Sequence, residues 1–151
     1  MPYAWVYPVL PVCFDSKFHA YQTVAQSIPN GAFTIMDFHA ELFDGLSEFN
    51  LATNRFQPIK NGYYLLIASV QIVAAVDQKV IEALMRLNGV TWIATFTSVN
   101  SGVSPPTARA TVIRYLLSTD YVEALAYQNT GVARNTEIWN YMTYFCGHRL
   151  S

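Results

Sequence analysis

Short apolar runs separated by turn residues are the feature of this chain that most restricts its fold. Runs of strand length recur along its 151 residues, and they are rich in the β-branched and aromatic residues that strands favour. These runs are Phe18–Val24, Phe33–Asp37, Phe38–Phe43, Tyr63–Ile72, Val80–Leu87, Val90–Thr97, Ala110–Leu117, Tyr121–Tyr127 and Ile138–Leu150. About nine short strands without a long helical pattern predict an all-β sandwich or barrel.

The clearest single element is a hairpin over Val80–Thr97. Asn88-Gly89 lies between two runs of strand length, and this dipeptide supplies the two positive-φ residues of a type I′ turn. Val80–Leu87 also contains good helix formers, so a short helix is the alternative. Its shortness and the turn that follows at once favour a strand.

The run Tyr63–Val70 is apolar on both of its faces. Side chains alternate between the faces of a strand. The two sets are Tyr63, Leu65 and Ile67, and Tyr64, Leu66 and Ala68. A strand with one solvated face should alternate polar and apolar residues, so the set outside the core needs a cover. Another subunit is the simplest cover, and a single large barrel with this strand under a loop is the alternative. We expect the first set to meet the partner, although a shift of one residue would reverse the assignment.

The composition also indicates a surface shared between copies. Only 13% of the residues are charged and 52% are hydrophobic, whereas ordinary domains carry roughly 25% charged residues. The net charge is -1 and no window is strongly basic, which argues against nucleic-acid binding and against a membrane surface. No apolar run reaches the roughly 18 residues that a spanning helix needs.

Residues 1–16 are predicted to form an extended, proline-rich arm ahead of one domain at 17–151. Met1–Leu10 is apolar, but it lacks the basic start of a signal peptide. Pro2 and Pro8 would break a helical h-region. The sequence has no Asn-x-Ser/Thr sequon, so nothing in it indicates glycosylation.

Catalytic and metal-binding motifs find no support. The three histidines, His19, His39 and His148, form no ligand motif, and His39-Ala40-Glu41 lacks the P-C-x-x-C that follows it in zinc deaminases. A group of carboxylates could bind Ca²⁺ or act as an acid–base pair, but we interpret it as solvated loop charges. Its members are Asp37, Glu41, Asp44 and Glu48. We therefore expect no enzymatic activity, no metal and no cofactor.

The two cysteines, Cys13 and Cys146, lie near opposite ends of the chain. They form neither a zinc cluster nor a Cys-x-x-Cys motif. We expect free thiols, and a disulfide is the alternative if the first and last strands are neighbours.

Four motifs, in order, resemble the C1q-like globular head of the C1q/tumour necrosis factor superfamily. They are Phe49–Phe56 (aromatic-Asn/Asp-x-x-Thr-Gly-x-Phe), Leu84–Gly89 (a strand ending in Asn-Gly), Leu117–Val122 (Leu-x-x-Gly-Asp-x-Val) and Tyr144–Leu150 (Phe-x-Gly-x-x-Leu). Asn54 and Thr119 replace glycines of the pattern, and Pro58 comes one residue early. Asn54 is a mild departure because Asn tolerates the left-handed region. The resemblance covers about Phe18 to Leu150.

The resemblance implies a two-sheet antiparallel jelly roll of about ten strands that assembles as a homotrimer. In such trimers the inner sheet packs on the core with one face and on the threefold axis with the other. The implied interface residues are Tyr63, Leu65, Ile67, Tyr115 and Tyr144. The resemblance also makes the first and last strands neighbours, which favours the Cys13–Cys146 disulfide more than the residues alone do.

Members of this superfamily bind rather than catalyse. Without a signal peptide, a sequon or a collagen-like stalk, we expect a non-enzymatic homotrimer in a virion: a phage decoration, capsid-associated or fibre-head protein. The arm would dock onto other virion proteins, and the rest would face the exterior. The alternative is an extracellular head that recognises a host glycan or receptor. Its candidate ligand surface comprises Trp92, Asn100 and Trp139.

Overall fold

The computed structural model describes residues 16–73, 78–102 and 104–151. In these ranges the chain is all-β, as predicted, and no helix is long and apolar enough to cross a membrane. The strands are β1 (Lys17–Tyr21), β2 (Ser27–Ile28), β3 (Thr34–Ile35), β4 (Ala40–Asp44), β5 (Phe49–Asn50), β6 (Arg55–Phe56), β7 (Gly62–Gln71), β8 (Val80–Leu87), β9 (Thr91–Val99), β10 (Thr107–Leu116), β11 (Val122–Gln128), β12 (Arg134–Asn135) and β13 (Tyr144–Arg149).

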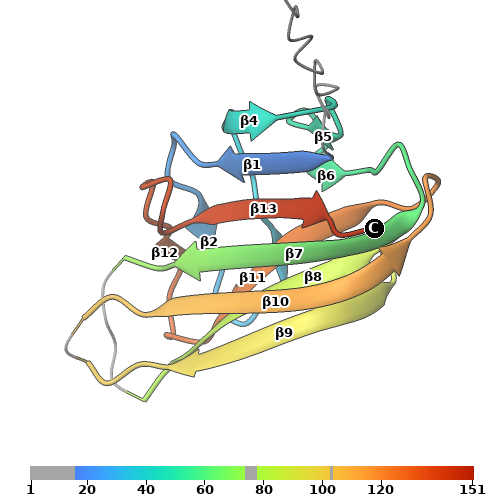
Figure 1. Cartoon of the computed structure of the whole chain (residues 1–151). Coiled ribbons are helices and arrows are strands. Elements are labelled where there is room, and N and C mark those ends of the chain that lie inside the picture. The colour runs from blue at the N-terminus through green and yellow to red at the C-terminus, as the bar shows by residue number, and fades with distance from the viewer. Residues whose placement is uncertain (1–15, 74–77, 103) are drawn as a thin grey trace, which may run out of the picture.

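The strands form two antiparallel sheets that pack face to face. One sheet has the order β10-β7-β13-β1-β4, and the other has the order β5-β6-β11-β8-β9, with β3 also paired to β11. Figure 1 shows the first sheet in front and β8, β9 and β11 behind it. Strands β2 and β12 form a separate short pair. β13 pairs with both β7 and β1, so the last strand of the chain lies inside its sheet.

One of the two alternating sets of β7 side chains points into the core between the sheets. Tyr64, Leu66 and Ala68 are fully buried, so Tyr63, Leu65 and Ile67 lie on the outer face of the five-stranded sheet. Phe18 on β1 stacks on Phe56, with ring centroids 4.4 Å apart. Burying this apolar surface is the main force that holds the two sheets together.

Gly147 lies on β13, between the paired strands β7 and β1, and faces the core. A Cβ atom at this position would lie 2.6 Å from Cδ2 of Leu66 and 2.7 Å from the carbonyl oxygen of Leu65. Strand pairing fixes that carbonyl, so only glycine fits. This requirement explains the glycine of the closing motif.

The expected hairpin is present, and several strand boundaries differ from the prediction. Asn88 and Gly89 have φ values of 52° and 71°, as a type I′ turn requires, and Val80–Leu87 is a strand rather than a helix. The strand expected at Ile138–Leu150 begins only at Tyr144. The preceding residues form a loop whose backbone bonds to other elements, which an apolar pattern cannot reveal.

Candidate functional site

The outer face of the five-stranded sheet is apolar and exposed in the single chain. β7 and β10 place Tyr63 opposite Tyr115 and Leu65 opposite Ile113. Ile113 is 60% exposed, Tyr63 51% and Tyr115 49%. The two tyrosine rings meet edge to face, with their centroids 5.2 Å apart. Exposed apolar patches of this kind mark interaction sites.

The structure places all five residues of the predicted interface on this one face. Tyr63, Leu65 and Ile67 lie on β7, Tyr115 lies on the adjacent β10, and Tyr144 lies on β13 beside β7. Their burial in one chain differs: Tyr144 is half-buried and Tyr115 is exposed. Burial raises the pKa of Tyr144 above its ordinary value, and the nearby Arg109 guanidinium opposes this shift.

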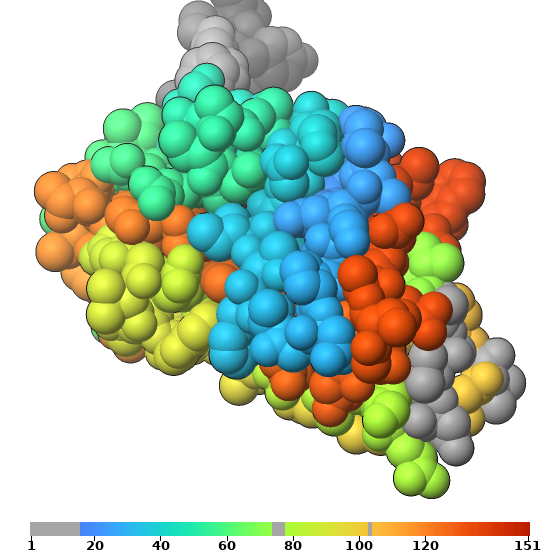
Figure 2. Space-filling model, turned by 180° about the vertical axis from the view of Figure 1, so that it is seen from behind, coloured from blue at the N-terminus to red at the C-terminus, as the bar shows by residue number. Residues whose placement is uncertain are grey.

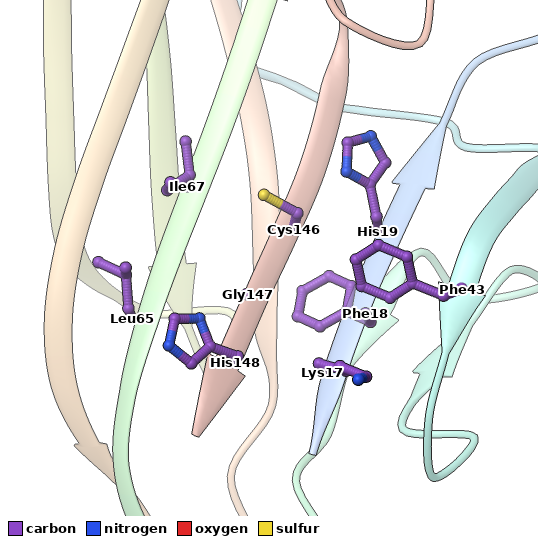
Figure 3. Close-up of a pocket in the computed structure, with 9 residues that line it drawn as sticks. All are labelled: Lys17, Phe18, His19, Phe43, Leu65, Ile67, Cys146, Gly147 and His148. Carbon is purple, nitrogen blue, oxygen red and sulfur yellow. The ribbon is translucent and has the colours of Figure 1, made fainter. Parts of the chain in front are cut away.

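A pocket of about 220 Å³ opens on the same face, toward its β4 side. Figure 3 shows its lining residues on neighbouring strands, with Cys146 on β13 between Ile67 on β7 and His19 on β1. Phe43 contributes an aromatic wall from β4. Burial raises the pKa of Cys146 to about 11, so its thiol stays protonated at neutral pH. Cys13 lies outside the described residues, so the free thiols stay a prediction and the disulfide stays the alternative.

His19 is held in place at the edge of this pocket. Its Nε2–H donates a hydrogen bond to the carbonyl oxygen of Asn140 at 3.0 Å, and its ring stacks on Tyr144 with centroids 4.9 Å apart. Burial lowers the pKa of His19, and the bond to Asn140 opposes this shift. Within the three described ranges, no cluster of His, Cys, Asp or Glu side chains could hold a metal ion.

The outer face of the six-stranded sheet has a different character, because a buried ion triad crosses it. Glu123 on β11 is paired with Arg55 on β6 and with Arg86 on β8. Its carboxylate lies 3.0 Å from Nε of Arg55 and 2.9 Å from Nη2 of Arg86, and its side chain is 1% exposed. The Arg55 guanidinium also stacks 4.1 Å above the Tyr121 ring.

Aromatic rings and the chain itself cover much of the remaining six-stranded face. Phe33 packs against Trp92 and Tyr127, with ring centroids 5.2 Å and 5.0 Å apart. Leu84 and Leu125 lie opposite each other and are buried, outside the main core cluster. Figure 2 shows the segment between β1 and β4, coloured blue to cyan, across the middle of this side.

The three residues of the predicted ligand surface do not lie together. Trp92 is near the start of β9 on the six-stranded sheet, whereas Trp139 lies in the loop before β13 of the other sheet. Asn100 is 5% exposed, and its Oδ1 accepts a bond from the Gly102 N–H. Its side chain therefore adds little to any surface.

Two of the four carboxylates interpreted as solvated loop charges are structural, so that interpretation was wrong for them. Glu48 is 4% exposed, and its carboxylate accepts bonds from the Ser16 hydroxyl and the Ile59 N–H. Asp44 accepts backbone N–H bonds from the turn that follows β4. Through these bonds, the Asp44 and Glu48 carboxylates hold the backbone of the loops around β5 and β6.

The comparisons with known proteins show the fold. No protein-family model and no curated protein matches the sequence. Murine APRIL at pH 5.0 superposes with a TM-score of 0.70 and 11% identity, over 90% of this chain and 99% of that one. The globular domain of zebrafish complement 1qA gives 0.64 and 14%, over 91% and 98%. The Eiger TNF from S. frugiperda gives 0.67 and 10%, over 91% and 93%. The chain therefore has the C1q/tumour necrosis factor-like jelly-roll fold that its motifs indicate.

Proposed function

We propose that this chain is a non-enzymatic binding module that works as a homotrimer, with the outer face of the five-stranded sheet buried between subunits. The observation that carries the proposal is the contrast between the two outer faces. Ile113, Tyr63 and Tyr115 are about half exposed in one chain. On the other face a buried ion triad crosses the sheet, although Phe33 and Trp92 of its aromatic cluster are also about half exposed. The resemblance to the superfamily supports the same assembly.

Threefold symmetry suits the shape of this face. In a closed ring, one part of the surface meets a different part of the neighbouring subunit. Ile113 and Tyr115 project from β10 at one side of the sheet, and the pocket of about 220 Å³ lies toward β4 at the other. In the proposed trimer, the projecting side chains of one subunit fill the pocket of the next.

Measuring the mass in solution tests the assembly directly. We expect light scattering to give three times the 17.0 kDa of one chain. Ile67→Asp should give a folded monomer, because a carboxylate buried without a partner costs several kcal/mol. Thr95→Asp is the matched control, since Thr95 is exposed on β9 of the other sheet. A wild-type chain that stays monomeric at micromolar concentration contradicts the proposal.

The thiol of Cys146 provides a second measurement, in a Cys13→Ser background. Cys146 lines the pocket, so the trimer should shield it from alkylation. We expect Ile113→Asp, which lies on β10 and outside the pocket lining, to accelerate the reaction at a fixed pH of 9. Equal rates in trimer and monomer would show that the pocket lies outside the subunit contact.

We also propose that the trimer belongs to a virion exposed to the exterior, as a decoration, capsid-associated or fibre-head component. Residues 1–16 would dock it to other virion proteins. The support is the arm's sequence, because its prolines favour extended backbone, which pairs readily with a strand of another protein. Immunogold electron microscopy of particles from the native source tests this. Label on the particles, lost when residues 1–15 are deleted, is the expected result; unlabelled particles contradict it.

A further inference from the structure

One loop presents two exposed aromatic rings side by side. It spans residues 137–143, between β12 and β13. Trp139 is 57% exposed and Tyr141 is 59% exposed. Their ring centroids are 6.2 Å apart, with an interplanar angle of 29°.

The backbone that carries these rings is firmly held. Within the loop, the N–H groups of Met142 and Thr143 bond to the carbonyl oxygen of Trp139 at 2.8 Å and 3.1 Å. At its start, the Glu137 N–H bonds to the carbonyl oxygen of Gln71 at 2.9 Å. Such a platform is ordered before any ligand arrives, which lowers the entropy cost of binding.

Bonds to the five-stranded sheet fix the rest of the loop. The Ser69 hydroxyl donates to the carbonyl oxygen of Met142 at 2.7 Å, and His19 donates to that of Asn140 at 3.0 Å. Thr143 is fully buried, and its Oγ1 accepts a bond from the Gln71 N–H. The exposure of the two rings is therefore not a sign of a loose loop.

Other exposed aromatic groups are already engaged. Trp92 packs on Phe33 and lies beside the Arg86 guanidinium. Tyr63 and Tyr115 belong to the proposed subunit contact. Among the described residues, the ring contact recorded for Trp139 is that with Tyr141, so much of its surface remains open to a ligand.

Polar residues with unused hydrogen-bonding capacity lie close to the two rings in the sequence. The side chains of Asn135, Glu137 and Asn140 make no hydrogen bond to other described residues. Two amides and a carboxylate offer both donors and acceptors. Glu137 is the single charged residue between positions 135 and 143, so an anionic ligand would meet a carboxylate and no compensating cation from the loop.

We propose that this loop binds a neutral glycan. One face of a pyranose ring carries C–H groups and packs on an aromatic surface, while its hydroxyl groups bond to amides and carboxylates. Trp139 and Tyr141 supply the aromatic surface, and Glu137, Asn135 and Asn140 supply the polar partners. The site stands on the geometry of one chain.

Avidity, in contrast, rests on the proposed trimer. Threefold symmetry places the same loop of each subunit at one end of the assembly. Three sites on one side can engage a surface rich in glycans together, and linked sites of this kind gain roughly 10²–10⁴-fold in apparent affinity.

A printed array of neutral oligosaccharides and their sialylated counterparts tests the site on the full chain. We expect binding to neutral oligosaccharides, a loss of at least tenfold with Trp139→Ala, and a smaller loss with Tyr141→Ala. Trp139→Phe should retain part of the binding, because it keeps an aromatic face. Trp92→Ala is the matched control and should bind like the wild type.

Three results would overturn the site. They are no neutral glycan bound by the wild type, unchanged binding in Trp139→Ala, and dissociation of the trimer by Trp139→Ala, which would assign the rings to subunit contact. The mass of each sample is measured in parallel. A monomeric wild type that still binds glycans through Trp139 would contradict the trimer and leave the glycan site intact.

Discussion

The outer faces of the two sheets differ in how their apolar and aromatic residues are packed. Both sheets have apolar or aromatic residues outside the core. On the six-stranded sheet, Glu123 binds two arginines and is buried, and Phe33 packs against neighbouring rings while remaining about half exposed. On the five-stranded sheet, Ile113 and Tyr115 remain about half exposed. The buried ion triad of the first face has no counterpart among the described residues of the second, which supports the proposal that another copy of the chain covers the second face.

This contrast also separates the free energy of folding from the free energy of association. Contacts on the six-stranded face should contribute to the stability of one folded chain. Contacts on the five-stranded face should contribute to association and little to folding. Substitutions on the two faces should therefore change different measurements.

The largest expected effect is that of Glu123→Ala. The substitution leaves Arg55 and Arg86 without their buried partner, and removing one member of a buried ion pair costs 3–5 kcal/mol. Both arginines can still reach water, with 41% and 24% of their side chains exposed. We therefore expect a loss of about 3 kcal/mol in the free energy of unfolding, measured by urea denaturation. Glu82→Ala, on the same face, should lose far less; an equal loss would contradict the role of the triad.

Ile113→Ala should weaken assembly without weakening the fold. Its side chain is 60% exposed in one chain and is buried only in the proposed trimer. We expect the dissociation constant to rise about tenfold, or about 1.4 kcal/mol, by sedimentation at a series of concentrations. Val90→Ala, in the hairpin of the other sheet, is 79% exposed and should change nothing. A lower stability of the separated Ile113→Ala chain would place this residue in the fold rather than in the contact.

Trp92→Ala should weaken the fold and leave assembly unchanged, and its effect should be smaller than that of Ile113→Ala. It removes the contact with Phe33 and the approach of the Arg86 guanidinium, 5.7 Å from the ring centroid. Aromatic pairs contribute about 1 kcal/mol beyond burial, so unfolding should become easier by about that amount. The mass in solution should stay that of the wild type. Dissociation of the assembly would show that Trp92 lies at a subunit contact.

The smallest effect concerns pH and His19. Burial lowers its pKa in the folded chain below the ordinary value, so the unfolded chain binds more protons as the pH falls below about 6.5. The stability from neutral His19 is thus present above that pH and is lost as the pH falls toward the folded pKa. We expect denaturation between pH 7 and 5 to lose less stability in His19→Gln than in the wild type. Identical pH profiles would contradict this assignment.

The sequence predicted the elements whose pattern is strictly local. Alternation along β7 separated the core set from the outer set, and Asn88-Gly89 identified a turn that needs two positive-φ residues. Of the two-residue strands, β3 lies within the expected run Phe33–Asp37. The others, such as β5 and β6, were missed because two residues are too few to show an alternating pattern. The loop before β13 was predicted as a strand because Ile138, Trp139 and Tyr141 resemble a strand in composition.

The site was harder to predict because its geometry depends on pairing between distant strands. Glu123 meets Arg55 and Arg86 only through the register of three strands, and no spacing along the chain shows this. Tyr141 was missed as a neighbour of Trp139, although residues two apart on the predicted strand would also share one face. Asn100 resembles an exposed loop residue in the sequence. In the structure it is buried, and its backbone forms hydrogen bonds with Gln78 and Lys79, just before β8.

The interior position of β13 has a consequence for how the protein is made. β1 and β4 join β7 only through β13, so the five-stranded sheet cannot close until β13 has been synthesised. Pairings between such distant segments form slowly. The pocket therefore forms only after β13 has been translated, whereas Ile113 needs only the pairing of β7 and β10. In the proposed trimer, a chain interrupted before Tyr144 would carry the projecting side chains but would lack the pocket that receives those of its neighbour.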